Sequence, residues 1–299
     1  MRLDELPQSD RIEDRRGGLS GSAGRRGGLG IGAIVVLGLI GWALGIDPRV
    51  LIQGAEEMSQ SSGPQQQSDA GSATSTGAPS DAMGHFVSAI LGSTEAQWTD
   101  IFAKSGKTYT APTLVMFSGA TQSGCGAARA AMGPFYCPLD RKVYLDTSFF
   151  DDLQRRFGAC DVGSKTCQFS EAYVIAHEIG HHVQNQLGLL PQVQQAQRGM
   201  DQAEVNSLQV RVELQADCFA GIWANRAQQK YQFIEPGDVE AALQTASAIG
   251  DDRLQRESQG YVVPDAFTHG TSAQRARWFT TGLKSGDVGS CDTFRTQQL

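Results

Sequence analysis

Two histidines four residues apart, His177 and His181, enclose a glutamate in the pattern His-Glu-x-x-His. On an α-helix, side chains four residues apart lie on the same face, so both imidazoles can bind one metal ion. Glu178 lies beside them, where its carboxylate can take a proton from an activated water. The pattern therefore predicts a catalytic zinc site, although so short a pattern also arises by chance.

The residues around this pattern have the periodicity of a buried amphipathic helix. Apolar residues recur at helical spacing between positions 173 and 187, Ser170 can cap the start, and Gly188 can end the helix. Burying two imidazoles and a carboxylate is costly unless something satisfies them, and a metal ion does so. His182 lies about 100° round the helix from His181 and is not expected to be a ligand.

A catalytic zinc site needs a third protein ligand, and a second helical stretch supplies candidates. Glu213 and Asp217 are again four residues apart, in a stretch that begins with a capping box of Asp201 and Glu204. We expect Glu213 to bind the metal and Asp217 to accept a hydrogen bond from the ring of a liganding histidine. A pair of solvated helix acids is the alternative interpretation of this spacing.

Together these motifs resemble those of the gluzincin metallopeptidases, in particular the branch of the CAAX prenyl protease and the heat-shock-linked membrane protease. Three further segments resemble the family of bacterial membrane-anchored proteins called the putative neutral zinc metallopeptidases. They are GPFYCPLD at 133–140, YVIAHE at 173–178 and FTHGTSAQR at 267–275. The resemblance runs from the N-terminal basic segment to near Cys291, and it implies a zinc-dependent peptidase.

The last of these segments contains His269 and, six residues later, Arg275. The CAAX protease branch has a histidine and an arginine at this spacing near the bound peptide. By this resemblance His269 and Arg275 are candidate catalytic residues that stabilise the oxyanion of the tetrahedral intermediate. The alternatives are a loop histidine bonded to backbone and a structural salt bridge.

Residues 27–46 form an uncharged, mostly apolar stretch about as long as a bilayer-spanning helix. Six arginines precede it, and only Arg49 follows it before Lys104. This bias predicts a single-pass anchor in the inner membrane, with a cytoplasmic N-terminus and the rest of the chain in the periplasm or outside. A cleaved signal peptide is the competing interpretation, but the stretch is longer than a usual apolar region of that kind.

The composition on either side of this stretch predicts the domain organisation. Residues 1–26 and 47–81 contain few large apolar side chains, so we expect a disordered basic segment and a flexible linker. Residues 82–299 are then one metallopeptidase domain. The formal net charge of −7 argues against a nucleic-acid partner.

All six cysteines lie in this expected domain, and an even number outside the cytoplasm is typical of a disulfide set. Proximity along the chain favours two pairs, Cys125 with Cys137 and Cys160 with Cys167. Cys218 and Cys291 then remain as the third pair. A cysteine zinc site is disfavoured because no Cys-x-x-Cys spacing occurs.

The fold expected is α+β: a mainly helical, zincin-like domain with a small β-sheet, preceded by one transmembrane helix. Strands are expected at 113–117 and 142–146, and helices at 149–157, 170–187, 201–229, 238–249 and 272–283. By resemblance to zincins, an edge strand of the sheet would hold the extended substrate. The residues proposed for that strand are Val143, Tyr144, Leu145 and Asp146.

The function expected is hydrolysis of a peptide or protein substrate by a membrane-anchored Zn²⁺ peptidase. The alternative is a catalytically weak or inactive zincin fold that only binds clients at the cell envelope. Retention of Glu178 favours the enzyme, because a purely structural zinc site has no need of a base. A metal hydrolase that acts on other bonds has the same ligand set.

Overall fold

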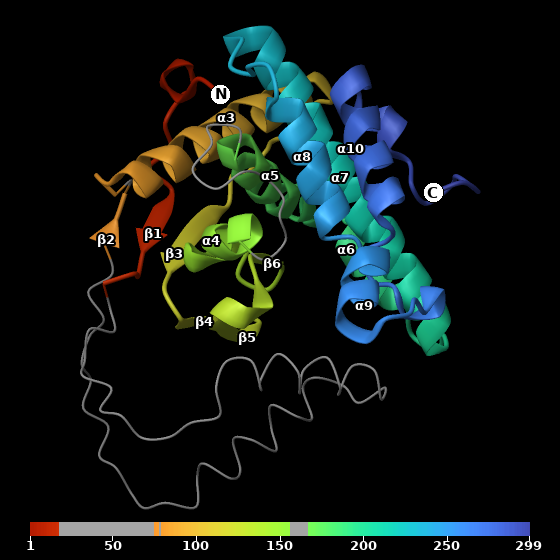
Figure 1. Ribbon diagram of the computed structural model, residues 1–299. Coiled ribbons are helices and arrows are strands. Elements are labelled where there is room, and N and C mark those ends of the chain that lie inside the picture. Colours follow the sequence, from red (N-terminus) through yellow and green to blue (C-terminus); the bar gives the residue numbers. More distant parts are fainter. Residues whose placement is uncertain (18–74, 78, 156–166) are drawn as a thin grey trace, which may run out of the picture. The chain divides into compact units, whose positions relative to one another are not determined.

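The computed structural model describes residues 1–17, 75–77, 79–155 and 167–299. The two predicted strands, at 113–117 and 142–146, lie next to each other in its main sheet (Figure 1). Strands β3 (Thr113–Phe117) and β7 (Lys142–Asp146) pair in parallel. The five-stranded sheet has the order β2-β1-β3-β7-β6, with β1 (Ile12–Asp14), β2 (Ser75–Thr76) and β6 (Phe135–Cys137). A separate hairpin joins β4 (Ala120–Ser123) to β5 (Gly126–Arg129).

Helices make up most of the described chain, which is therefore α+β and mainly helical, as predicted. The long helices are α3 (Ala82–Lys104), α5 (Cys167–Gln186), α7 (Gln202–Tyr231) and α10 (Ser272–Ser285). The shorter ones are α4 (Ser148–Arg155), α6 (Leu189–Ala196), α8 (Asp238–Ala248) and α9 (Asp251–Gln259). Four short 3₁₀ segments join them, at Leu3–Glu5, Ala130–Met132, Pro264–Ala266 and Val288–Cys291.

The central helix is α5, which packs against α3, α7 and α8 and also contacts β6 and β7. It begins at Cys167, three residues before the expected cap, so Ser170 lies buried within its first turns. Helix α7 begins as predicted, because Asp201 and Glu204 form both hydrogen bonds of a capping box. Buried aromatic rings of α3, α5 and α7 fill the space between these helices, among them Trp98, Phe169, Phe219 and Trp223.

The N-terminal segment differs from its expected disorder, since residues 1–17 belong to the same folded unit as residues 74–299. Strand β1 pairs in parallel with β3, opposite Leu114, Val115 and Met116. Met1, Leu6 and Ile12 are buried in the main core. The few apolar residues of this segment therefore suffice, because backbone pairing with β3 adds to their burial.

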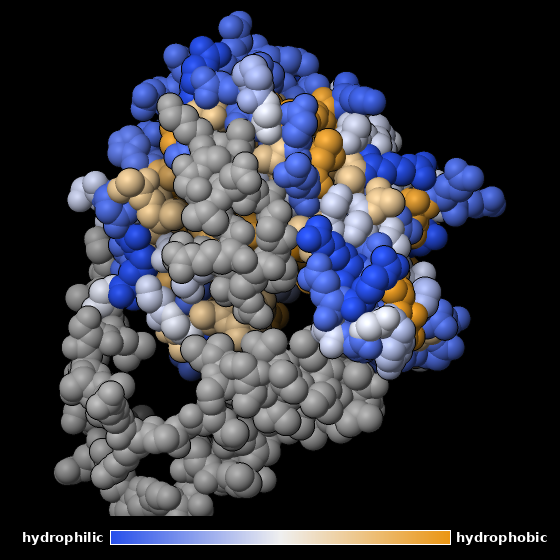
Figure 2. Space-filling model, viewed as in Figure 1, coloured by the Kyte–Doolittle hydropathy of each residue, from blue (hydrophilic) through white to orange (hydrophobic). Residues whose placement is uncertain are grey.

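The predicted membrane span at 27–46 lies outside the described residues, as does most of the expected linker. Within the part of the chain that the structure describes, no helix is both long enough and apolar enough to cross a bilayer. On the face shown in Figure 2, most of the described residues that can be seen are polar, and apolar residues show as smaller patches among them.

Two of the three expected disulfides are formed, Cys125–Cys137 and Cys218–Cys291. Cys167 is also disulfide-bonded, while Cys160, its expected partner, lies outside the described residues. The first bridge fixes β6 to the loop between β4 and β5. The second fixes α7 to the C-terminal segment that follows α10.

The N-terminal segment also crosses α3 in close contact at Gly92, where an added Cβ atom would overlap the backbone of Pro7 and Gln8. In a free helix Gly→Ala is stabilising by about 1 kcal/mol. We predict that Gly92→Ala instead lowers the free energy of unfolding by about 1–3 kcal/mol, because the segment is forced off the helix. Chemical denaturation followed by circular dichroism measures this change.

Gly17→Ala is the control, because a Cβ atom there meets nothing within 4 Å. A Gly92→Ala protein as stable as the unmodified chain would contradict the packing of the N-terminal segment on α3.

Candidate metal centre

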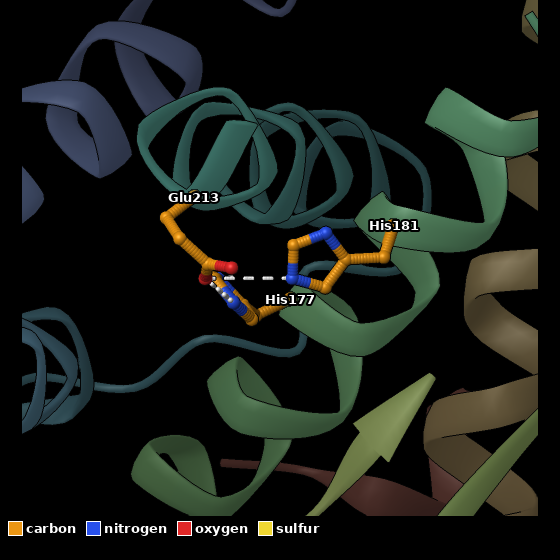
Figure 3. Close-up of side chains that lie close together, drawn as sticks. All are labelled: His177, His181 and Glu213. Atoms are coloured by element: carbon orange, nitrogen blue, oxygen red, sulfur yellow. Dashed lines mark hydrogen bonds and ion pairs between the residues drawn. The ribbon is translucent and has the colours of Figure 1, made fainter. Parts of the chain in front are cut away.

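Helices α5 and α7 bring together the three residues expected to bind metal. His177 and His181 point from α5 towards the carboxylate of Glu213 on α7 (Figure 3). The Glu213 Oε2 atom lies 3.1 Å from His177 Nε2 and 3.5 Å from His181 Nε2. One potential ligand atom from each residue lies within 4.8 Å of the other two.

The glycine within the histidine motif allows α7 to approach this closely. A Cβ atom on Gly180 would lie 3.0 Å from the carbonyl oxygen of Ala216 and 3.2 Å from its Cβ atom. These are tight contacts, so a larger residue would push the helices apart. The small size of Gly180 therefore allows Glu213 on α7 to reach both histidines.

Asp217 lies behind His177, as predicted for a residue that orients a ligand. Its Oδ1 atom is 2.8 Å from His177 Nδ1. A carboxylate can only accept, so the Nδ1–H of His177 donates to Asp217, and Nε2, which faces Glu213, is the ring nitrogen that would bind a metal. Asp217 is completely buried.

Arg275 occupies a different position from the one expected of an oxyanion-stabilising residue. Its guanidinium is buried and forms two hydrogen bonds to Asp217, of 2.9 and 3.0 Å. It also donates to the hydroxyl of Tyr173, which itself donates to Asp217 at 2.5 Å. Arg275 therefore forms a buried salt bridge with Asp217, which in turn bonds to His177, in agreement with the salt-bridge alternative.

The carboxylates of the site favour positive charge at the imidazoles. Burial lowers the pKa of His177, but Asp217 and Glu213 outweigh it and raise that pKa to about 10. Burial raises the pKa of Glu213, yet His181 and His177 hold it well below its usual range. Burial likewise opposes ionisation of Asp217, whose pKa is lowered to about 2 by Arg275 and His177.

The pKa of Glu178 is raised, whereas that of the neighbouring carboxylate of Glu213 is lowered. Burial raises the pKa of Glu178 above the usual value, although the neighbouring His177 and His181 act in the other direction. A carboxylate that ionises less readily than usual is a stronger base and is suited to general acid–base work near neutral pH. The side chain is 7% exposed, so its proton exchange is largely confined to the site.

Two glutamines complete the surroundings of the expected ligands and were missed by the sequence analysis. Gln184 Oε1 lies 2.9 Å from His181 Nδ1, and Gln209 Nε2 donates to Glu213 Oε1 at 3.0 Å. Each lies three or four residues from the ligand it holds, on the same helix. That spacing was the available signal.

His182, which was not expected to be a ligand, faces β6 and the loop before β3. Its Nε2–H donates to the carbonyl oxygen of Thr110 at 2.7 Å, and its Nδ1 accepts from Tyr136 at 3.1 Å. Burial lowers the pKa of His182 to about 4. The neutral ring thus joins the metal-site helix to β6.

His269 lies in the loop before α10, close enough to the centre for its charge to interact with that of Glu213. The imidazole is half exposed, and its Nδ1 atom lies 3.2 Å from Asp251 Oδ1. The loss of water from the covered half of the ring lowers the pKa of His269, but Asp251 and Glu213 raise it overall. Asp251 also accepts backbone N–H bonds from residues 268, 269 and 270, so it fixes the whole loop.

The strand expected to bind substrate is not an edge strand. Val143, Tyr144, Leu145 and Asp146 belong to β7, which lies between β3 and β6. All four side chains are buried, and Asp146 accepts hydrogen bonds from Gly119 and Ser148. The prediction was wrong because the parallel pairing of β7 with β3 joins segments that are distant in the sequence.

The donor set fits zinc. Two imidazole nitrogens and one carboxylate oxygen, supplied by two helices, are the usual ligands of a catalytic zinc ion that keeps one position open. The buried Asp217 on His177 supplies the support that such ligands require.

The chain matches the family described as "Putative neutral zinc metallopeptidase" over residues 1–294. It belongs to this family. The uncharacterized protein YpfJ of Escherichia coli is 48% identical over 300 residues, which cover 98% of this chain and 99% of that protein. The uncharacterized protein Mb2605 of Mycobacterium bovis is 45% identical over 200 residues, which cover 64% and 65% of the two chains. No solved structure matches.

The position of Arg275 leads to a test of its role. Arg275→Met leaves Asp217 buried without its cationic partner, and breaking a buried pair in this way costs about 3–5 kcal/mol at neutral pH. Asp217 has a folded pKa of about 2 against an ordinary 3.8. Its contribution to stability is therefore present above pH 3.8 and is lost as the pH falls towards 2.

We therefore predict that the difference in unfolding free energy between the unmodified chain and Arg275→Met is largest near neutral pH and narrows on acidification. Urea denaturation at several pH values measures it. Arg277→Met on the same helix is the control, because Arg277 is exposed and its described contacts are the carbonyl oxygen of Leu299 and the ring of Trp278. A pH-independent difference would show that Arg275 does not act through Asp217.

Proposed function

We propose that this protein is a zinc-dependent peptidase that hydrolyses peptide bonds. The observation that carries the proposal is the convergence of His177, His181 and Glu213 from two helices, with the buried carboxylate of Glu178 beside them. A structural zinc site is usually closed by four protein ligands. Three ligands and an adjacent base favour catalysis.

The three ligands would hold Zn²⁺, which when bound polarises the scissile carbonyl and lowers the pKa of water towards neutrality. Glu178 removes the proton of the attacking water and delivers it to the leaving amine. Its raised pKa suits both steps, because the same carboxylate must accept and then donate a proton. Asp217 and Arg275 keep the ring of His177 fixed during the reaction.

We assign to His269 the stabilisation of negative charge on the substrate oxygen. Its ring is half exposed and interacts electrostatically with Glu213, and because Asp251 holds Nδ1, the Nε2–H is left to donate to a substrate. A donor held in this way needs no reorganisation when charge develops on the substrate. In this proposal Asp251 is the positioning residue for His269.

The edge strand β6 takes the role first expected of β7. In the described sheet β6 pairs only with β7, so its other edge can pair with an extended peptide. Tyr136 on β6 bonds to His182 and Asn185 of the metal-site helix. The edge of β6 that would pair with a peptide and the metal ligands on α5 are therefore held at a fixed separation.

The expected effect of Glu178→Gln tests this mechanism. The variant should bind zinc and unfold like the unmodified chain, because the three ligands and their supports are unchanged. Hydrolysis should fall by about 10²–10⁴-fold, since the proton transfer is lost. Peptide-library cleavage by the zinc-loaded protein, read by mass spectrometry, measures the change.

Glu240→Gln, at an exposed position of α8, is the matched control and should keep full activity. Near-normal turnover by Glu178→Gln would rule out Glu178 as the base. A zinc-loaded unmodified protein that binds peptides and cleaves none would favour the alternative, a zincin fold used only for binding.

A further inference from the structure

A chain of hydrogen bonds leads from His181 away from the proposed zinc site. Gln184 Oε1 faces His181 Nδ1 at 2.9 Å, and Gln184 Nε2 donates to Gln215 Oε1 at 3.0 Å. Gln215 Nε2 in turn donates to the carbonyl oxygen of Cys291 at 3.0 Å. Both glutamines are buried, and the Cys218–Cys291 disulfide fixes the last member of the chain to α7.

The acceptor at the end of this series of hydrogen bonds fixes the direction of every bond in it. The carbonyl oxygen of Cys291 can only accept, so Gln215 must present its NH₂ group there and its oxygen to Gln184. Gln184 must present its NH₂ group to Gln215 and also to the carbonyl oxygen of Val212, which lies 2.8 Å away. The oxygen of Gln184 is therefore left for His181, whose Nδ1 must carry the hydrogen.

We propose that Gln184 and Gln215 are positioning residues that fix the tautomer and ring orientation of His181 for zinc. The Nε2 atom of His181, which lies on the side of Glu213, is then the ring nitrogen that would bind zinc. Gln184 thus does for His181 what Asp217 does for His177, with a neutral amide in place of a carboxylate. This proposal rests on the zinc site proposed above.

The test compares zinc affinity with stability. Gln184→Met keeps the length of the side chain and removes its acceptor, and we expect zinc affinity to fall by about 10–100-fold. Gln215→Met should have a smaller effect in the same direction, because Gln184 keeps its bond to Val212. Competition with a chromogenic chelator measures the zinc dissociation constant, and urea denaturation measures the folded fraction.

Asn225→Ala is the control. Asn225, also on α7, donates to the carbonyl oxygen of Leu283 at 2.7 Å and should lose stability without losing zinc affinity. If Gln184→Met folds and binds zinc as tightly as the unmodified chain, this proposal is overturned and the zinc site stands. If the unmodified chain does not bind zinc, the proposed function fails first. Should Gln184→Met not fold, an unchanged zinc affinity in folded Gln215→Met overturns the proposal.

A second, independent observation concerns the N-terminal segment. β1 lies between β2 and β3, so residues 12–14 share a sheet with residues 75–76 and 113–117. Ser9 exchanges hydrogen bonds with Ser88 of α3, at 3.0 and 2.7 Å. Arg16, which was counted in the membrane-topology prediction, forms ion pairs of 2.7 Å with Asp14 and Asp81.

A sheet cannot form across a bilayer, because its strands must lie within about 5 Å of one another. We infer that residues 1–17 occupy the same compartment as residues 75–299 in the folded protein. A single crossing at 27–46 is incompatible with this arrangement, and residues 47–73 contain no second apolar stretch of sufficient length. This inference replaces the expected cytoplasmic location of the N-terminus opposite an external domain.

Thiol labelling of the full chain in cells tests the inference. Gln8→Cys and Gln194→Cys each introduce an exposed thiol, one in the N-terminal segment and one on α6. A membrane-impermeant maleimide is added before or after lysis. We expect both variants to be labelled under the same condition, whichever it is. Labelling of one variant in intact cells and of the other only after lysis would overturn the inference.

Discussion

The ionised carboxylate of Asp217, completely buried between three helices, is the constraint on which the site depends. A buried charge without partners costs several kcal/mol or more, so the surrounding residues must satisfy it. Arg275 from α10, Tyr173 from α5 and His177 from α5 do so. Any displacement of α5, α7 or α10 would break one of these bonds. The orientation of His177 therefore depends on the packing of these three helices.

Helix α7 is the common support of the centre. Within six consecutive residues it supplies Glu213 to the expected zinc site, Asp217 to His177, and Gln215 with Cys218 to the C-terminal segment. Glu213 and Asp217 face α5, while Gln215 and Cys218 are bonded to Cys291 in the segment after α10. The segment after α10 is therefore connected to the metal centre through hydrogen bonds and a disulfide, although none of its residues is a candidate ligand.

The parts of this arrangement that local periodicity determines could be predicted from the sequence. The ligand spacing, the capping box of α7, strands β3 and β7, and two disulfides are local patterns or follow from a small number of cysteines. Helix α3 was missed because it contains Gly84 and Gly92, which disfavour helices. Gly92 is required by a long-range contact, since the backbone of Pro7 packs against it.

The errors have the same origin. The N-terminal segment was expected to be disordered because its polar composition gives no sign of its partners in α3 and β3. The edge position was assigned to β7 rather than β6 because strand order is set by distant pairings. The contact of Arg275 with Asp217 could not be predicted from its spacing to His269, because spacing does not give the direction in which a side chain points.

Zinc X-ray absorption of the metal-loaded protein tests the central claim most directly. We predict one zinc ion per chain, bound by nitrogen and oxygen at about 2.0–2.2 Å with the scattering pattern of two imidazoles. Glu213→Ala should lose most of this zinc. Sulfur ligands at about 2.3 Å, or a full complement of zinc in Glu213→Ala, would contradict a centre formed by His177, His181 and Glu213.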